Sequence, residues 1–543
     1  MKKYLPLFLI LIIAGLLRLV ALDKFPAGLN ADEAAIGYNA WSLLQTGRDE
    51  HSVSWPLVFR SFDDYKPPVY FYLVLPFVKI LGLNIWAVRL PSAILGVASV
   101  FLIFLLAGKL VPKNKYFPYL SAFLLAISPW HLQFSRGGWE VNAALFFILL
   151  GIWAFFKALE RPKFIFLFVV ALALSLYTYH SARLISPLLA LSLVILYWPQ
   201  LFQPQKLKLL IGAAIFGFLL SLPLASQLLS KEGQSRFAGV SVFADSGPLW
   251  QALELRRAHT PETIFVKALH NQYLSYGLRF VKNYLSHYSP RFLFIVGDEI
   301  ARSKVPRMGE SYLFLIPFYA LGLFALLKLD SREKQFIGLW FLIAPLAAAL
   351  TFQSPHALRA QNMLIPLTLI TALGLAVVLK LLTRNGSRWL FSTVIGVLAL
   401  VTGYSVSRYL HLYFVHYPQE LPYAWQYGFD QVAAYTQANG SRYDHLLISD
   451  RYDQPYILMA FFLRYPPQTL QKELVMTPRD KFGFSTVRQF GKYEFRAINY
   501  EADKKLKNTL IMATDEPVDD RAVIFTIYDP AGKPMYKFIP TAK

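Results

Sequence analysis

Residues 68–82 read PVYFYLVLPFVKILG, an apolar run of 15 residues with Pro76 and Lys79 inside it. A helix that crosses a membrane needs roughly 20 apolar residues, because the hydrocarbon core is about 30 Å thick. This stretch decides the topology, since counting it as a crossing would invert every loop that follows. We interpret it as a helix that lies in the membrane interface. A short tilted crossing is the alternative.

The composition of the 543-residue chain indicates a polytopic membrane protein. Apolar residues make up 55%, charged residues 16%, and the mean hydropathy is +0.40. Soluble domains carry about 25% charged residues, so this chain has too few charges to cover a water-facing surface. Soluble enzymes, collagens and coiled coils are therefore excluded. Because the chain has no cysteine, disulfides, thiolate metal sites and Cys nucleophiles are excluded as well.

The apolar runs on either side of residues 68–82 predict a polytopic α-helical protein with about eleven transmembrane helices. They lie near residues 4–22, 86–109, 117–134, 141–158, 163–180, 184–198, 207–228, 311–328, 335–352, 361–381 and 388–407. Lys and Arg cluster in alternate short loops, and this bias predicts that the N-terminus is cytoplasmic. We therefore expect a multi-pass protein of the cytoplasmic membrane.

The long hydrophilic segments then all fall on the outer side. Residues 1–408 are predicted to form the transmembrane domain, with a first outer loop at 23–85 and a large outer loop at 229–310. Residues 409–543 are predicted to form a small extracytoplasmic α/β domain. Its strand-like runs are HLLIS, TLIMAT and AVIFTIY, and a helix is expected over Tyr423–Asn439.

The first outer loop carries a pair of carboxylates at the start of a predicted helix. Asn30 is a good N-cap, the helix is expected to run to Thr46, and Asp32 and Glu33 fall in its first turn. Such carboxylates complement the helix dipole. At the outer edge of a membrane a partly desolvated carboxylate is also a suitable general base for a hydroxyl or amine nucleophile.

Cations occupy several outer turns. Lys66 follows Asp63-Asp64-Tyr65 and precedes two prolines, where it could neutralise a phosphate or snorkel to lipid headgroups. Arg136, Arg183 and Arg359 lie in short outer turns among aromatic or His residues. Each could bind a lipid phosphate or cap a helix. Together with Lys66 they predict an anion site for a phosphorylated lipid.

Five stretches resemble a known family: ADEAAIGYNAWSLLQTG (31–47), DDYKPPVYFYL (63–73), WAVRLPSAILG (86–96), SPWHLQFSRGGWEVN (128–142) and YHSARLISP (179–187). The resemblance is to the bacterial branch of glycosyltransferase family 39, which holds protein O-mannosyltransferases and aminoarabinose lipid A transferases. It covers about residues 1–380 and is most specific in the first 190. It implies the GT-C membrane fold and an inverting transfer of a sugar from a polyprenyl-phosphate carrier outside the cytoplasmic membrane.

The resemblance also implies roles for residues. Asp32 matches the catalytic base, with Glu33 beside it. The expected ligands of the donor phosphate are Lys66, Arg136 and Arg359. The expected substrate-binding residues are Glu140, Tyr177, His180, Arg183 and His356. The family's extra sugar-binding β domain is absent, so the acceptor remains open between a lipid, a glycan and a protein.

The residues also bear on metal ions, other partners and alternative functions. No metal site is predicted, although Asp49, Glu50 and His51 could offer ligands to a divalent cation. The basic and tyrosine residues of 229–310 suit either sugar rings or anionic lipid headgroups. Nucleic acid is not expected as a partner. A flippase or transporter of lipids or sugars, and a wall-polymer ligase that uses a diphosphate-linked glycan, are the alternative functions.

Overall fold

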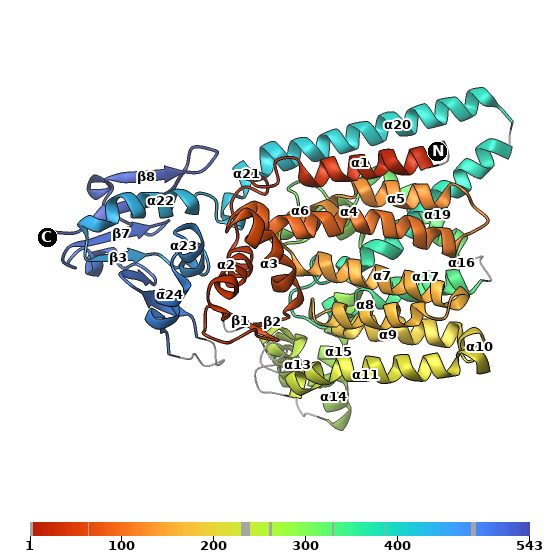
Figure 1. The fold of residues 1–543 in the computed structure, drawn as a ribbon, viewed down its shortest axis with the longest axis horizontal. Helices are drawn as coiled ribbons and strands as arrows, with labels where there is room; N and C mark the ends of the chain where they lie inside the picture. Colours follow the sequence, from red (N-terminus) through yellow and green to blue (C-terminus); the bar gives the residue numbers. More distant parts are fainter. Residues whose placement is uncertain are drawn as a thin grey trace. The chain divides into compact units, whose positions relative to one another are not determined.

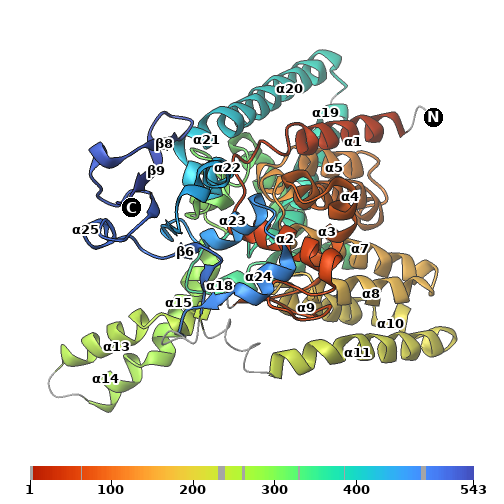
Figure 2. The same ribbon diagram turned by 60° about the vertical axis from the view of Figure 1, so that its left-hand side comes forward.

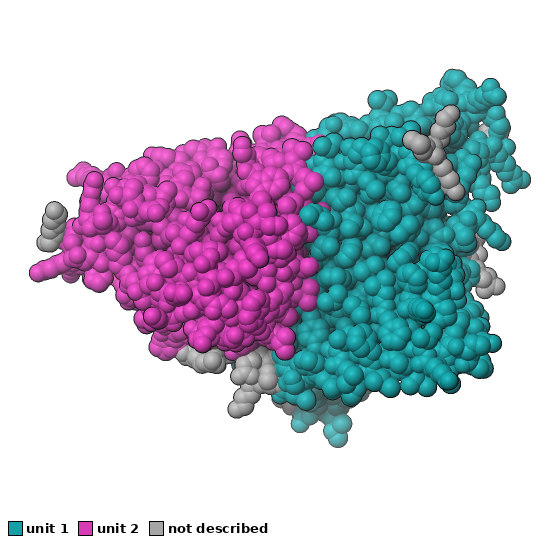
Figure 3. Space-filling model, in the orientation of Figure 1, with its two compact units in different colours: residues 1–18, 94–135, 140–409 teal, residues 19–93, 136–139, 410–543 magenta. Residues whose placement is uncertain are grey.

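The computed structural model describes residues 4–62, 64–229, 239–259, 263–327, 331–384, 386–478 and 485–542. Asp63 and parts of the predicted outer loop 229–310 lie outside the described residues. The chain divides into two compact units, coloured separately in Figure 3. Unit 1 comprises residues 1–18, 94–135 and 140–409, and unit 2 comprises residues 19–93, 136–139 and 410–543.

Unit 1 is helical. The unit boundaries fall within α1 (Leu5–Leu19), α4 (Ile85–Leu110), α6 (Pro129–Arg136) and α20 (Arg388–His411). The other helices of unit 1 are α5 (Phe117–Ile127), α7 (Glu140–Glu160), α8 (Phe164–Leu176), α9 (Ala182–Leu196), α10 (Trp198–Leu201), α11 (Leu207–Leu229), α13 (Gly247–Arg257), α14 (Ile264–Leu269), α15 (Gln272–Ser286), α16 (Ile316–Leu327), α17 (Arg332–Ile343), α18 (Leu346–Ala349) and α19 (Leu364–Arg384). Helix α8 packs against α7 and α11, and Figure 1 shows α7, α8, α9 and α11 side by side.

Several helices have the length and composition of membrane spans. Among the described residues, five helices qualify: Ile85–Leu110, Glu140–Glu160, Pro204–Leu229, Gln361–Arg384 and Arg388–Glu420. Six shorter apolar helices accompany them. These helices agree with a multi-pass membrane protein, whereas the count of eleven crossings stays a prediction. Residues 68–82 do form a helix, α3 (Val69–Leu81), and its place in the interface stays a prediction too.

Unit 2 combines the first loop with the C-terminal part of the chain. Helix α2 (Ala31–Thr46) has the predicted ends: the Asn30 side chain caps its N-terminus, and Gly47, with φ 69°, ends it in the left-handed region that favours glycine. Strands β1 (Phe59–Ser61) and β2 (Asp64–Lys66) form an antiparallel hairpin that leads into α3. Helix α2 packs against α3, so the first loop is a folded element.

The C-terminal part is an α/β domain, as predicted. Within the described residues its seven strands follow the order β4-β5-β6-β3-β7-β9-β8. The strands are β3 (His445–Ile448), β4 (Val475–Met476), β5 (Val487–Phe490), β6 (Tyr493–Phe495), β7 (Thr509–Ala513), β8 (Phe525–Tyr528) and β9 (Pro534–Pro540). The helices are α21 (Tyr417–Glu420), α22 (Phe429–Asn439), α23 (Pro455–Phe462), α24 (Pro467–Glu473) and α25 (Tyr500–Asp503). Strand β3 is parallel to β6 and β7, and every residue of β7 is buried.

One predicted boundary in this domain is wrong. A helix was expected to begin at Tyr423, but α22 begins at Phe429. Residues Pro422–Trp425 form a 3-10 turn, and Gln426 and Gly428 adopt φ values of 50° and 82°. Two residues in the left-handed region cannot continue an α-helix, so the helix starts only after Gly428.

Helices α16 and α19 approach each other at two glycines. A Cβ atom built on Gly322 would overlap the carbonyl oxygen of Ile370, and one on Gly374 would overlap that of Phe318. Small residues allow backbones of apolar helices to pack closely, which replaces the hydrophobic driving force that a membrane lacks. The two glycines therefore determine the spacing of this helix pair.

We predict that Gly322→Ala and Gly374→Ala each destabilise unit 1 by about 1–3 kcal/mol, because the added methyl group forces two backbones apart. Thermal unfolding in detergent measures the effect. Gly403→Ala is the matched control, since a Cβ atom added to Gly403 would have no neighbouring atom within 4 Å and alanine favours the helix. Equal unfolding midpoints in all three variants would contradict the proposed packing role.

Candidate active site

Asp32 and Lys66 form an ion pair in unit 2. Nζ of Lys66 donates to Oδ1 of Asp32, and the side chains are 8% and 25% exposed for Lys66 and Asp32. Asp32 lies in the first turn of α2, and Lys66 ends β2 with its ammonium over the Phe62 ring, 5.1 Å from the ring centroid. The pair thus joins a carboxylate that solvent still reaches to a nearly buried lysine.

Glu33, the neighbour of Asp32, is fully buried and held by Arg89. Its Oε1 accepts from Nε of Arg89 at 2.8 Å and from the backbone N–H of Gly138 at 2.7 Å. Its Oε2 accepts from Nη2 of Arg89 at 2.9 Å and from the N–H of Asn30 at 3.3 Å. A carboxylate has about four acceptor positions, and all are engaged here. The geometry therefore favours Glu33 as a positioning residue.

Arg89 uses its remaining donors on the chain that precedes α2. Nη1 donates to the carbonyl oxygens of Leu22 and Pro26 at 3.1 and 2.9 Å, and Nη2 donates to that of Gly28. One guanidinium therefore fixes both the incoming loop and the first turn of the helix. A planar five-donor group is suited to this work, and lysine could not replace it.

Arg136, an expected phosphate ligand, is 1% exposed. Its Nη2 donates to the carbonyl oxygens of Val20 and Phe25 at 2.9 and 3.1 Å, and its Nε donates to Oη of Tyr413 at 3.2 Å. The guanidinium also lies over the Tyr413 ring at 5.2 Å. These contacts connect three chain segments of unit 2, so the geometry favours a structural role for Arg136.

The C-terminal part of unit 2 also contacts α2 directly. Oε1 of Gln426 accepts from the N–H of Ala31 at 2.7 Å, and Nε2 of Gln426 donates to the carbonyl oxygens of Tyr452 and Asp453. The Arg89 guanidinium lies over the ring of the neighbouring Trp425, and its Cζ is 5.5 Å from the centroid of that ring. Gln426 therefore joins the residue before Asp32 to the α/β domain.

The two carboxylates among the three candidate metal ligands in the first loop are engaged otherwise. Oδ1 of Asp49 accepts the N–H groups of His51 and Val53, which shapes the turn. Glu50 is fully buried and accepts from Nδ2 of Asn39 at 2.9 Å. No group of three or more His, Asp or Glu side chains in the described parts of the chain is arranged to hold a metal ion. These residues do not fit a metal centre.

Burial raises the pKa of Glu50 to about 7, although the bond from Asn39 opposes the change and nearby Asp49 adds to it. Tyr456 of the C-terminal domain donates to Oε2 of Glu50 at 3.3 Å. The positive charge of Lys66 acts on the same carboxyl and lowers its pKa. Glu50, whose pKa lies near neutral pH, therefore interacts electrostatically with Lys66, the partner of Asp32.

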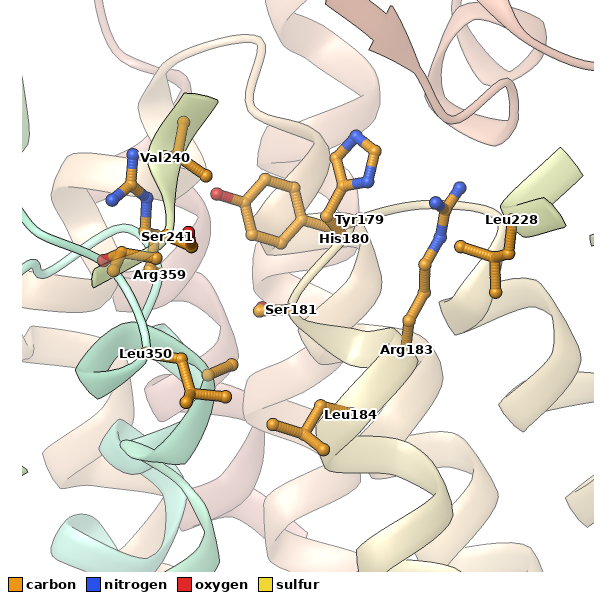
Figure 4. Close-up of a pocket in the computed structure, with 12 residues that line it drawn as sticks. Tyr179, His180, Ser181, Arg183, Leu184, Leu228, Val240, Ser241, Leu350 and Arg359 are labelled. Atoms are coloured by element: carbon orange, nitrogen blue, oxygen red, sulfur yellow. The ribbon is translucent and has the colours of Figure 1, made fainter. Parts of the chain in front are cut away.

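Unit 1 contains a separate pocket of about 220 Å³. It is lined by Tyr179, His180, Ser181, Arg183, Leu184, Leu228, Val240, Ser241, Ala347, Leu350, Thr351 and Arg359. In Figure 4 the guanidinium groups of Arg183 and Arg359 and the imidazole of His180 lie toward one end, and Leu184 and Leu350 lie toward the other. A pocket with a cationic end and an apolar end suits an amphiphile with an anionic head.

The loop that carries Arg359 is held by buried polar groups. Oδ2 of Asp298 accepts the N–H of Ala357 at 2.6 Å and lies 3.2 Å from Nδ1 of His356. The N–H of His356 donates to Nε2 of His287 at 3.2 Å. Burial raises the pKa of Asp298, but its bonds to His356, Ile300 and Ala357 outweigh burial, so the pKa lies below its ordinary value. His356 thus supports the loop rather than lining the pocket.

Two expected substrate-binding residues lie elsewhere in unit 1. Glu140 begins α7 and is 8% exposed. Oη of Tyr177 donates to the carbonyl oxygen of Leu220 at 2.8 Å and accepts the N–H of Leu224 at 3.0 Å, which ties the end of α8 to α11. The structure therefore groups His180, Arg183 and Arg359 in one pocket of unit 1, and Asp32, Glu33 and Lys66 in unit 2.

Comparison with known sequences agrees with the motifs. Residues 65–225 match the family described as dolichyl-phosphate-mannose-protein mannosyltransferase. A stretch of 103 residues is 36% identical to the mannosyltransferase-like protein YkcB of Bacillus subtilis and covers 19% of this chain and 14% of YkcB. A stretch of 102 residues is 28% identical to YycA of the same organism and covers 19% of this chain and 15% of YycA. The matches thus span a small part of these relatives.

Two solved structures share the fold. ArnT from Cupriavidus metallidurans, bound to undecaprenyl phosphate, aligns over 98% of this chain and 97% of its own, with a TM-score of 0.50 and 13% identity. The fold that the motif resemblance implies is therefore the fold of this chain. The oligosaccharyltransferase AglB from Archaeoglobus fulgidus, in complex with an inhibitory peptide and a dolichol-phosphate, aligns over 85% of this chain and 64% of its own, with a TM-score of 0.50 and 15% identity. At these identities the likeness concerns the fold.

Sequence reasoning missed Arg89 and Gln426. Arg89 did carry a signal, because a charged residue inside the apolar stretch WAVRLPSAILG is costly unless it has a buried partner. Gln426 carried none. Its partner Ala31 is 395 positions away, and a glutamine in a loop predicts no contact at that distance.

We predict that stability of unit 2 falls as pH rises from about 4.5 toward and beyond 7, because folded Glu50 binds a proton that the unfolded chain releases. The loss is on the order of 3 kcal/mol by pH 8. Glu50→Gln keeps a neutral group that can bond with Asn39 and Tyr456. Its unfolding midpoint should therefore rise relative to wild type as pH increases from 5 to 8.

Glu254→Gln is the control, because Glu254 is exposed on α13. Thermal unfolding of the three proteins between pH 5 and 8 provides the measurement. Parallel midpoint curves for wild type and Glu50→Gln would show that Glu50 does not titrate in this range.

We predict that Gln426→Met loosens the first turn of α2, because it removes an acceptor from the buried N–H of Ala31 and a donor from the partly buried carbonyl groups of Tyr452 and Asp453. Such a loss costs about 2 kcal/mol, so amide exchange over residues 29–36 should accelerate by up to about thirtyfold. Hydrogen exchange followed by mass spectrometry measures this rate. Gln489→Met, which removes only a bond to Gly491 within its own turn, should leave residues 29–36 unchanged.

Proposed function

We propose that this protein transfers a sugar from a polyprenyl-phosphate-linked donor to an acceptor in one inverting step. The observation that carries the proposal is the Asp32–Lys66 pair, in which a partly exposed carboxylate stands on a helix turn held by Glu33, Arg89 and Gln426. A general base must be accessible and fixed in position. Asp32 meets both requirements, whereas Glu33 has no acceptor position left.

The chemistry needs no covalent intermediate. Asp32 accepts the proton of the acceptor hydroxyl or amine, and the acceptor atom bonds to the anomeric carbon from the face opposite the phosphate. The bond between the anomeric carbon and the phosphate oxygen breaks, and its electron pair leaves with the carrier as a phosphate monoester. Cations near that oxygen stabilise the developing charge.

The pocket of unit 1 is our candidate for the carrier phosphate. Arg183 and Arg359 supply charge, His180 supplies a polar group, and the leucines at the other end suit an isoprenoid chain. Two proteins that share the fold have been solved with undecaprenyl phosphate or a dolichol-phosphate bound, and this supports the same ligand class here. Phosphate binding by Lys66 is part of the proposal, whereas Arg136 is assigned to the support of unit 2.

We also propose that the reaction takes place on the outer face of the cytoplasmic membrane. The basic residues of the short loops support a cytoplasmic N-terminus. With that orientation the first loop, which carries Asp32, and the C-terminal domain both lie outside. The acceptor is a lipid, a glycan or a protein that presents a hydroxyl or amine.

The test uses the full-length protein in detergent with a panel of radiolabelled polyprenyl-monophosphate sugars. Release of polyprenyl phosphate is followed for wild type, Asp32→Asn and the control Asp450→Asn, which changes an exposed aspartate of the C-terminal domain. We expect Asp32→Asn to lower kcat by about 10²–10⁴ without loss of fold, and Asp450→Asn to retain activity. Wild-type turnover by Asp32→Asn would remove Asp32 as the base.

The pocket is tested separately with Arg183→Gln and Arg359→Gln. Each variant loses a charged contact worth about 1.5–3 kcal/mol, so KM for the donor should rise by roughly 10-fold or more while kcat changes less. Arg521→Gln, in the C-terminal domain, is the control.

The same assays distinguish the alternative functions. If the protein cleaves only a diphosphate-linked glycan, the wall-polymer ligase is favoured. If it moves intact lipid without cleavage, the flippase is favoured.

A further inference from the structure

Helix α15 in unit 1 has two faces of different character. On its inner face, Nδ2 of Asn283 donates to the carbonyl oxygens of Ala349 and Thr351 at 3.3 and 3.0 Å. Oη of Tyr276 on the same side donates to the carbonyl oxygen of Asp245 at 3.1 Å. This face is therefore packed against the protein by specific polar contacts.

The opposite face of α15 is apolar and exposed. Leu274, Leu278, Val281 and Leu285 follow at intervals of four, three and four residues, which places them on one stripe of the helix. They are 43%, 62%, 48% and 58% exposed, respectively. A water-facing helix normally turns its polar residues outward, so the pattern here is reversed.

Two apolar side chains of α14, the helix before α15 in the chain, are exposed as well. Ile264 and Phe265 at the start of α14 are 88% and 70% exposed, and α13 packs against α15. Figure 2 shows α13 and α14 beside α15. We call the residues Ile264, Phe265, Leu274, Leu278, Val281 and Leu285 the α14–α15 apolar surface.

The segments that carry the α14–α15 apolar surface, and the neighbouring α13, are basic. Residues 239–259 and 263–290 contain two acidic residues against five Lys or Arg: Arg256, Arg257, Lys267, Arg279 and Lys282. Arg279 lies 3.8 Å from Asp245, and Lys267 and Lys282 are exposed. This charge distribution complements an anionic surface.

The combination of length and charge in α15 does not suit a membrane span. It has 15 residues and carries Arg279 and Lys282, whereas a crossing requires about 20 apolar residues. A short helix with an apolar face and basic flanks instead lies in the plane of the interface, with its apolar side among the acyl chains and its charges among the headgroups.

We propose that the α14–α15 apolar surface docks on the headgroup–acyl boundary of an anionic lipid leaflet. The same helix supports the pocket of unit 1, because Asn283 binds the carbonyl oxygen of Thr351, a lining residue, and His287 binds the backbone of His356. Docking of α15 therefore places the pocket wall that this helix supports at the level of the lipid headgroups. The docking itself does not rest on the proposed transferase activity.

The absence of cysteine allows a direct test in the full-length chain. Leu278→Cys and Leu285→Cys each introduce a single thiol on the apolar stripe, and Lys505→Cys provides an exposed control in the C-terminal domain. Each thiol receives an environment-sensitive fluorophore, and the protein is placed in nanodiscs of phosphatidylcholine with or without phosphatidylglycerol. Quenching by aqueous iodide and by brominated lipids is then measured.

We expect labels at residues 278 and 285 to be quenched several-fold more by brominated lipids, and several-fold less by iodide, than the label at residue 505. The difference should be larger with phosphatidylglycerol, and Lys267→Gln with Lys282→Gln should remove that increase. Equal iodide access at all three positions would overturn the proposal. Protection that persists in detergent and depends on protein concentration would assign the surface to a second copy of the chain and would overturn it too.

Discussion

The buried ion pair between Glu33 and Arg89 is the interaction on which unit 2 depends. Two charges without solvent are tolerated only when each finds several partners. Glu33 has four donors around it, and Arg89 reaches both Glu33 and three carbonyl groups of the preceding loop. The loss of either residue would leave the other charged and buried. Asp32 precedes Glu33 in the same helix turn, so the Glu33–Arg89 pair also determines the position of the candidate base.

Unit 2 is assembled from three chain segments that are far apart in sequence, and each contributes to the same few atoms. The first loop provides Glu33, the turn at residues 136–139 provides the N–H of Gly138, and the C-terminal part provides Trp425 and Gln426. The C-terminal domain is therefore part of the structure around Asp32. Its contacts support the helix turn that carries Asp32.

Much of the fold could be predicted because its signals are local. Asn30 and Gly47 mark the ends of α2, and runs such as TLIMAT mark buried strands. The candidate site was harder to predict from the sequence than the fold. The motif resemblance pointed to Asp32, Lys66 and Arg359, but the residue types alone give two adjacent carboxylates, Asp32 and Glu33, which differ only once their partners are known. Arg136 looked like a phosphate ligand because its backbone acceptors, among them Val20, leave no trace in the sequence.

The bond between Ala31 and Gln426 has a consequence for the order of events during synthesis. The two residues are 395 positions apart, so at about 5–20 residues per second the ribosome adds the second roughly 20–80 s after the first. For most of that interval the segment with Asp32 lies outside the ribosome while its partner does not yet exist. The nascent protein therefore lacks this contact of the candidate active-site helix until nearly four-fifths of its chain has been translated.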